Sequence, residues 1–93
     1  MNREEFKTQA TETIDDIYSK IDDLKSRKEN AKENVKSDYE KAIKSLEDKK
    51  KVVEEKYENL NHATEDKWHE TKDAFSSATD SFKKGFKEIA SVF

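Results

Sequence analysis

Apolar side chains return every three or four positions along nearly the whole chain, and almost nothing interrupts the pattern. This spacing is typical of an amphipathic α-helix, which gathers those residues on one face. Gly85 is the only glycine, and the chain contains no proline. The pattern therefore predicts long helices, each with an apolar stripe that needs a partner surface.

Large aliphatic and aromatic residues make up this stripe. Its principal positions are Phe6, Ile14, Ile17, Ile21, Leu24, Val35, Tyr39, Leu46, Val53, Tyr57, Leu60, Trp68, Phe75, Phe82, Phe86 and Ile89. We interpret this set, the interaction stripe, as the residues that pack one helix against another. Lys28 and Lys50 also fall on the stripe, where a lysine can lay its stem along apolar surface and keep its ammonium in water.

Helix starts and breaks are signalled at three places. Asn2, followed three residues later by Glu5, predicts a capping box at the first helix. The strongest internal break is at residues 59–66, where two asparagines and a histidine are poor helix formers and Thr64 can cap a new helix. A weaker candidate runs from Ser26 to Asn34, where the stripe thins.

The favoured architecture is all-α, a hairpin with one helix over about 3–60 and a second over about 64–91. Its shorter arm leaves the stripe from Phe6 to Leu24 bare, so we expect two hairpins to pair as an antiparallel coiled-coil or bundle dimer. The alternative uses both breaks and gives a monomeric three-helix bundle. One unbroken rod is a third arrangement. Each makes residues 1–93 a single helical coiled-coil domain.

Composition narrows the classes of protein. Apolar residues are 31% and charged residues 44% of the chain, but 19 basic and 22 acidic residues nearly cancel. Interspersed, balanced charge favours helices with a narrow buried seam over disorder, and it argues against a nucleic-acid partner. There is no cysteine, no signal-peptide pattern at the N-terminus and no apolar run of membrane-spanning length. We therefore expect a cytoplasmic protein.

Candidate chemistry is sparse. Glu65, His69 and Asp73 share one helical face and could bind a divalent metal weakly, but ordinary surface pairs at this spacing are the favoured interpretation. No histidine–carboxylate arrangement supports a serine nucleophile, and no glycine-rich phosphate loop is present. We therefore expect no catalytic residue, no metal, no cofactor and no small-molecule substrate.

Aromatic residues concentrate in the last third of the chain. They are Trp68, Phe75, Phe82, Phe86 and Phe93. One interpretation is a helix that lies on a membrane surface. The favoured interpretation places the rings in the core, where neighbouring alanines leave room.

Several short segments resemble a family of small, largely uncharacterised bacterial coiled-coil proteins. They are Ile21-Asp22-Asp23-Leu24-Lys25, Asp38-Tyr39-Glu40, Tyr57-Glu58-Asn59-Leu60 and Glu65-Asp66-Lys67-Trp68, with Phe75 and Phe82. The tryptophan just after the break is the most specific part. The resemblance implies a helical, soluble, self-associating protein connected with stress or the envelope, and it carries over no catalytic residue.

The leading expectation for function is a non-enzymatic structural or interaction protein that self-associates through its stripe, with a homodimer favoured. The alternative is an apolipoprotein-like protein whose amphipathic helices bind lipid or another apolar surface. A third class is a protectant that becomes helical only when dried or crowded, which the high charged fraction motivates. Cooperative melting in dilute buffer would exclude that class.

Overall fold

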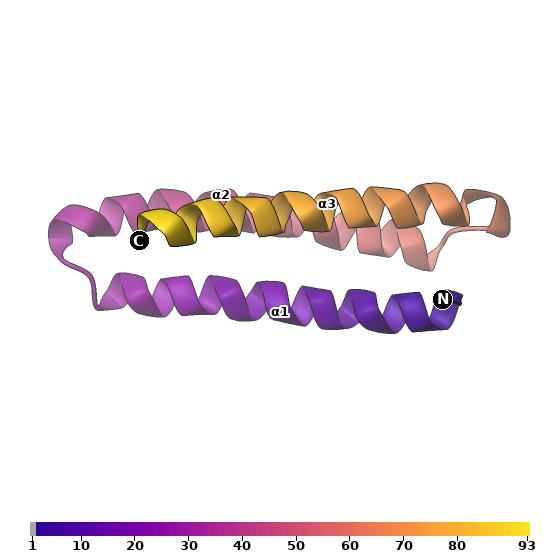
Figure 1. Ribbon diagram of the computed structural model, residues 1–93, viewed down its shortest axis with the longest axis horizontal. Helices are drawn as coiled ribbons and strands as arrows, with labels where there is room; N and C mark the ends of the chain where they lie inside the picture. Colours follow the sequence, from indigo (N-terminus) through magenta and orange to yellow (C-terminus); the bar gives the residue numbers. More distant parts are fainter. Residues whose placement is uncertain (1) are drawn as a thin grey trace.

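The computed structural model describes residues 2–93, which form three α-helices. Helix α1 spans Arg3–Glu29, α2 spans Glu33–Asn61 and α3 spans Glu65–Val92. The helices lie side by side in an elongated molecule of 51 × 19 × 17 Å, and α2 runs antiparallel to both α1 and α3 (Figure 1). The all-α class is confirmed, and the arrangement is a three-helix bundle.

The first helix begins where the capping pattern predicts. The Asn2 side chain accepts a hydrogen bond from the backbone N–H of Glu5 at 2.8 Å, and its amide donates to the Glu5 carboxylate at 2.8 Å. These bonds satisfy one of the helix's free N–H groups, and Glu4 and Glu5 complement the positive end of the helix dipole. The local sequence thus fixes the start of α1.

The favoured helix over 3–60 is wrong in one respect, because the chain turns at residues 30–32. Asn30 caps α1 with φ −95° and ψ 2°, and its side-chain amide donates to the carbonyl of Ser26. Lys32 is extended, with φ −68° and ψ 151°, and starts α2. The turn lies inside the weaker candidate segment from Ser26 to Asn34. The reversal lets α1 bury its apolar face against helices of the same chain. Local helix propensity does not include this contribution of tertiary packing.

The second turn confirms the break predicted at residues 59–66. Helix α2 ends at Asn61, and Thr64 is the N-cap of α3 with φ −75° and ψ 169°. The Thr64 side chain makes no capping hydrogen bond, so that detail of the prediction is wrong. Glu65 and Asp66 occupy the first turn of α3, where negative charge is favourable.

The core is a narrow apolar seam in which α2 is central. Its buried residues are Ala10, Ile17, Ile21, Leu24, Tyr39, Ile43, Leu46, Val53, Leu60, Phe75 and Phe82. Leu46, Val53 and Leu60 from α2 and Phe82 from α3 are 0% exposed. This seam includes the α1 residues that a hairpin would leave bare. The uncovered surface that motivated the dimer is therefore absent from this bundle.

Gly85 is an interior helical residue, and α3 runs through it. A Cβ atom at this position would lie 3.2 Å from Cε of Lys49 on α2. The glycine therefore lets the Lys49 stem cross closely over α3, a contact that the sequence pattern does not reveal.

Candidate interaction surface

The interaction stripe forms the interior of the bundle. Nine of its sixteen positions are buried, and the remainder, which are half-buried, are Phe6, Ile14, Val35, Tyr57, Trp68, Phe86 and Ile89. Most of these half-buried side chains pack against the core cluster. The stripe packs helix against helix within one chain.

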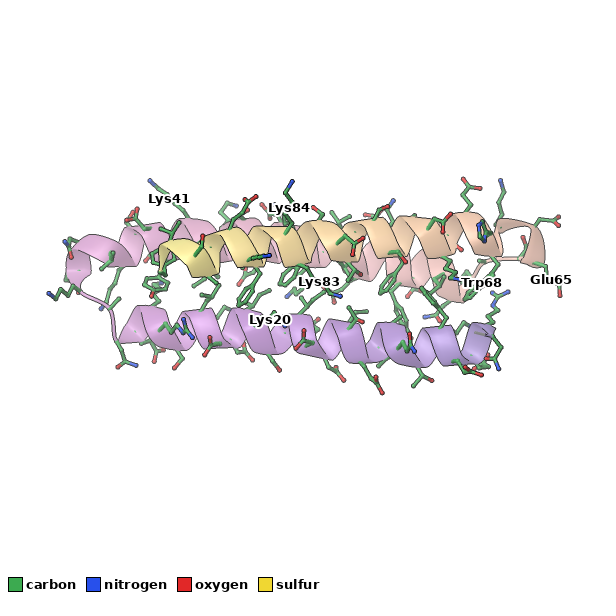
Figure 2. All side chains as sticks on the ribbon, viewed as in Figure 1. Lys20, Lys41, Glu65, Trp68, Lys83 and Lys84 are labelled. Atoms are coloured by element: carbon green, nitrogen blue, oxygen red, sulfur yellow. The ribbon has the colours of Figure 1, made fainter. Side chains whose placement is uncertain are left out.

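The three helix pairs are not equally close. Helix α2 packs along both neighbours, whereas α1 and α3 approach each other at few points. At one end Phe6 meets Trp68 edge-on, with ring centroids 5.8 Å apart, and the Arg3 guanidinium lies 4.5 Å from the Trp68 ring. Nearer the other end the Lys20 ammonium lies 5.6 Å from the Phe86 ring. Figure 2 shows Trp68 on the side of α3 that faces α1, while Lys41 and Lys84 project away from α1.

Between these contacts the surface is hollowed, and we call this hollow the α1–α3 groove. A cavity of about 160 Å³ is lined by Phe6, Gln9, Ala10, Thr13, Phe75, Ser76, Thr79, Asp80 and Lys83. A neighbouring depression of about 350 Å³ is lined by Gln9, Glu12, Thr13, Asp16 and Lys83. The groove has an apolar floor with polar sides that carry three acidic residues and one lysine. Along this edge, α1 is held less tightly than along α2.

Thr79 lies in the wall of the groove and is 6% exposed. Its hydroxyl is the one buried side-chain polar atom among residues 2–93 that has no hydrogen-bond partner. The Thr11, Thr13 and Thr71 hydroxyls each donate to the backbone carbonyl four residues earlier, as helical threonines commonly do. An unpaired buried hydroxyl costs about 1–3 kcal/mol. The α1–α3 edge is therefore also where the packing is least well satisfied.

Polar contacts across the α1–α2 edge are better developed. The Tyr18 hydroxyl donates to the Glu54 carboxylate at 2.6 Å, and this hydrogen bond raises the pKa of Tyr18 above its ordinary value. Lys25 pairs with Glu47 at 3.1 Å, and this hydrogen bond lowers the pKa of the Glu47 carboxyl. Periodicity along the chain does not predict these pairs, because their members are far apart in sequence.

The two stripe lysines behave as predicted. Lys28 is half-buried, and its ammonium pairs with Glu40 on α2 at 3.1 Å. Lys50 is half-buried, with its ammonium 4.7 Å from the Tyr18 ring. Each ammonium thus has a polar or aromatic partner while the residue as a whole is partly covered.

The metal candidate on α3 does not converge on one point. His69 lies 3.7 Å from Asp73, and both side chains are largely exposed. The other histidine, His62, contacts Glu58 at 2.9 Å. Among residues 2–93, no three histidine, cysteine, aspartate or glutamate side chains are placed to hold a metal ion. The two histidine–carboxylate pairs are ordinary surface contacts one helical turn apart.

The aromatic residues of α3 point into the bundle. Phe75 and Phe82 are buried, and Trp68 and Phe86 pack against the core from its margin. Phe93 stacks on Tyr39, with ring centroids 4.1 Å apart and planes at 20°, although 36% of Phe93 is exposed. This placement agrees with the core interpretation of the aromatic run. Over residues 2–93, no helix is both long enough and apolar enough to cross a membrane.

Comparison of the chain with protein-family models, with curated proteins and with solved structures finds no match. The resemblance to small bacterial coiled-coil proteins therefore stays a prediction. Any function must be inferred from the contacts that the chain itself makes.

Proposed function

We propose that this chain is a non-enzymatic helical interaction protein that self-associates through its apolar stripe, with a second copy as the partner. Its compartment, on this proposal, is the cytoplasm. The observation that supports it is the loose edge between α1 and α3, where the unpartnered Thr79 hydroxyl and the half-buried Phe6 both line the groove. A helix bundle in which two helix pairs pack along their lengths and the third pair meets at few points has a place where helices can join or exchange.

The size of the core adds to this proposal. With 31% apolar residues, one chain supplies a narrow seam, and several stripe residues stay half-buried in the bundle. Sharing the stripe between two chains buries more of this apolar area, and each additional Å² contributes about 25 cal/mol. Self-association would stabilise the fold as well as join two copies.

The test is the mass in solution, measured by light scattering from low to high micromolar concentration, with helicity followed by circular dichroism. We expect a mass above the 10.9 kDa of one chain and a melting temperature that rises with concentration. A fully helical protein that keeps the mass of one chain at every concentration would overturn the proposal.

A second candidate function is binding to a lipid surface. Helix α3 carries Trp68, Phe75, Phe82 and Phe86 on one face, and the loose α1–α3 edge offers a route for these rings to turn outward. Val92, which is 78% exposed, adds apolar surface at the end of α3. Vesicle flotation separates the two candidates, since a protein that floats with neither neutral nor anionic vesicles is not a lipid binder.

A further inference from the structure

We infer that two copies of this chain associate by exchanging α1, with the turn at residues 30–32 straightening into helix. Helix α1 and helix α2 then form one continuous helix over residues 3–61, and the α1 of each chain occupies the place of α1 in the partner's bundle. This inference rests on the proposed self-association and specifies its mechanism.

The composition of the turn allows this change. The chain reverses through Asn30, Ala31 and Lys32 without glycine or proline, and no residue in the range 2–93 has a positive φ. Asn30, at φ −95° and ψ 2°, lies in the bridge region that borders the helical one. Lys32 is extended, and its side chain makes no capping hydrogen bond to α2. Alanine and lysine are among the best helix formers, so little local preference holds the turn open.

The stripe is also in phase across the turn. Leu24, Lys28, Ala31, Val35 and Tyr39 follow one another at steps of three or four residues. A continuous helix therefore presents the stripe of α1 and the stripe of α2 on the same face, so each half can pack into a bundle. Half-buried Ala31 and Val35 would lie where the two long helices cross, and each would gain a partner there.

Exchange preserves the contacts of α1 and adds hydrogen bonds at the turn. The Lys25–Glu47 and Tyr18–Glu54 pairs re-form between chains instead of within one chain. The straight helix also pairs the backbone C=O groups at the last turn of α1 with N–H groups at the first turn of α2. In the closed bundle these groups have no intrahelical partner. Helix α1 is held closely by α2 and loosely by α3, so the loose edge is the side on which its release can begin.

Proline at residue 33 separates the two forms. Residue 33 is the first residue of α2, where proline is well tolerated, and proline holds the preceding residue extended, as Lys32 is at ψ 151°. In the continuous helix the same proline is interior, where it removes a hydrogen bond and clashes with the preceding turn. With two such helices per dimer, we expect Glu33→Pro to raise the dissociation constant about 10⁴-fold while the monomer stays folded.

Two controls match this variant. Glu33→Ala removes the same carboxylate and its 3.2 Å pair with Lys36 but permits the straight helix, so it should still dimerise. Glu65→Pro places proline at the first residue of α3, the equivalent position at the second turn, and should also still dimerise. If Glu65→Pro and not Glu33→Pro gives monomers, the exchanged element is α3 and the inference is wrong.

Cross-linking identifies the mechanism directly, because the chain has no cysteine of its own. The double variant Lys25→Cys, Glu47→Cys places thiols at a pair whose side chains meet across α1 and α2. The protein is refolded at high concentration and treated with a short bis-maleimide. Exchange gives a covalent dimer on a denaturing gel, whereas copies that dock side by side give cross-links within one chain.

Small-angle scattering supplies a second measurement. The continuous helix is roughly 90 Å long at ~1.5 Å per residue, against 51 Å for the closed bundle. A dimer with cross-links within each chain and a dimeric Glu33→Pro variant would overturn the exchange and leave the proposed self-association standing. A wild-type protein that is monomeric at all concentrations would overturn both.

Discussion

Replacement of Gly85 by alanine sets two measurable effects against each other. Alanine is about 1 kcal/mol more favourable than glycine in a helix interior, and Gly85 lies within α3. Against this gain, the new Cβ would lie 3.2 Å from Cε, 3.4 Å from Cδ and 3.5 Å from Nζ of Lys49. Carbon atoms pack best at about 3.5–4.0 Å, so the end of the lysine must move by a few tenths of an ångström.

The side chain that must move decides the result. Lys49 is half-buried, and the atoms nearest the new methyl group belong to the flexible end of its stem. We expect this adjustment to cost less than about half of the helical gain, because long charged side chains readily change rotamer at a surface. The net effect of Gly85→Ala should be stabilisation by about 0.5–1 kcal/mol, or about 3–6 °C in the melting temperature.

The measurement is urea unfolding followed by circular dichroism at one fixed protein concentration, with Lys49→Ala as the second arm of a double-mutant cycle. In the Lys49→Ala background the gain from Gly85→Ala should approach the full ~1 kcal/mol. Destabilisation by Gly85→Ala in both backgrounds would refute the reasoning, because it would mean that α3 is not an ordinary helix at residue 85.

Three further changes test separate features of the bundle. Thr79→Val should stabilise by about 1 kcal/mol in urea unfolding because it removes an unpartnered buried hydroxyl, whereas Thr71→Val, which deletes a bonded hydroxyl, should give no such gain. Asn2→Ala should destabilise by about 1 kcal/mol in the same measurement by removing the cap of α1; an unchanged midpoint would mean that the cap does not contribute. The Glu47 carboxyl, with its pKa lowered by Lys25, should contribute stability that is present above its unfolded pKa and is lost as pH falls through its folded pKa. Lys25→Ala should reduce this acid-side loss by less than about 1 kcal/mol in melts across that range, because the pair is exposed, and an unaltered pH profile would contradict the linkage.

The two turns show what local sequence can and cannot specify. The second turn was predictable because Asn61, His62 and Thr64 all disfavour a helix interior. At the first turn, Ala31 and Lys32 favour helix, and only Asn30 opposes it. The chain turns there because burial of α1 against helices distant in the sequence outweighs the helix propensity of a few residues.

The packing of α1 against α3 could not be predicted from the sequence, for a related reason. Periodicity identifies which face of a helix is apolar, and it placed Phe6, Phe75 and Phe82 correctly. It does not indicate how closely two such faces approach, because the distance depends on side-chain volumes from both helices together. Thr79 illustrates this limit, since its polar side chain suggests exposure and the bundle buries it.

An odd number of helices has a geometric consequence for anything joined to this domain. Asn2 and Phe93 lie toward opposite ends of the long axis, whereas an even-numbered bundle of alternating helices would return both to one end (Figure 1). Modules attached at these two positions would be kept apart by most of a rod 51 Å long, so the bundle can act as a fixed-length spacer. Straightening the turn at residues 30–32 would lengthen that spacer. Dimerisation would then also change the distance between the attached modules.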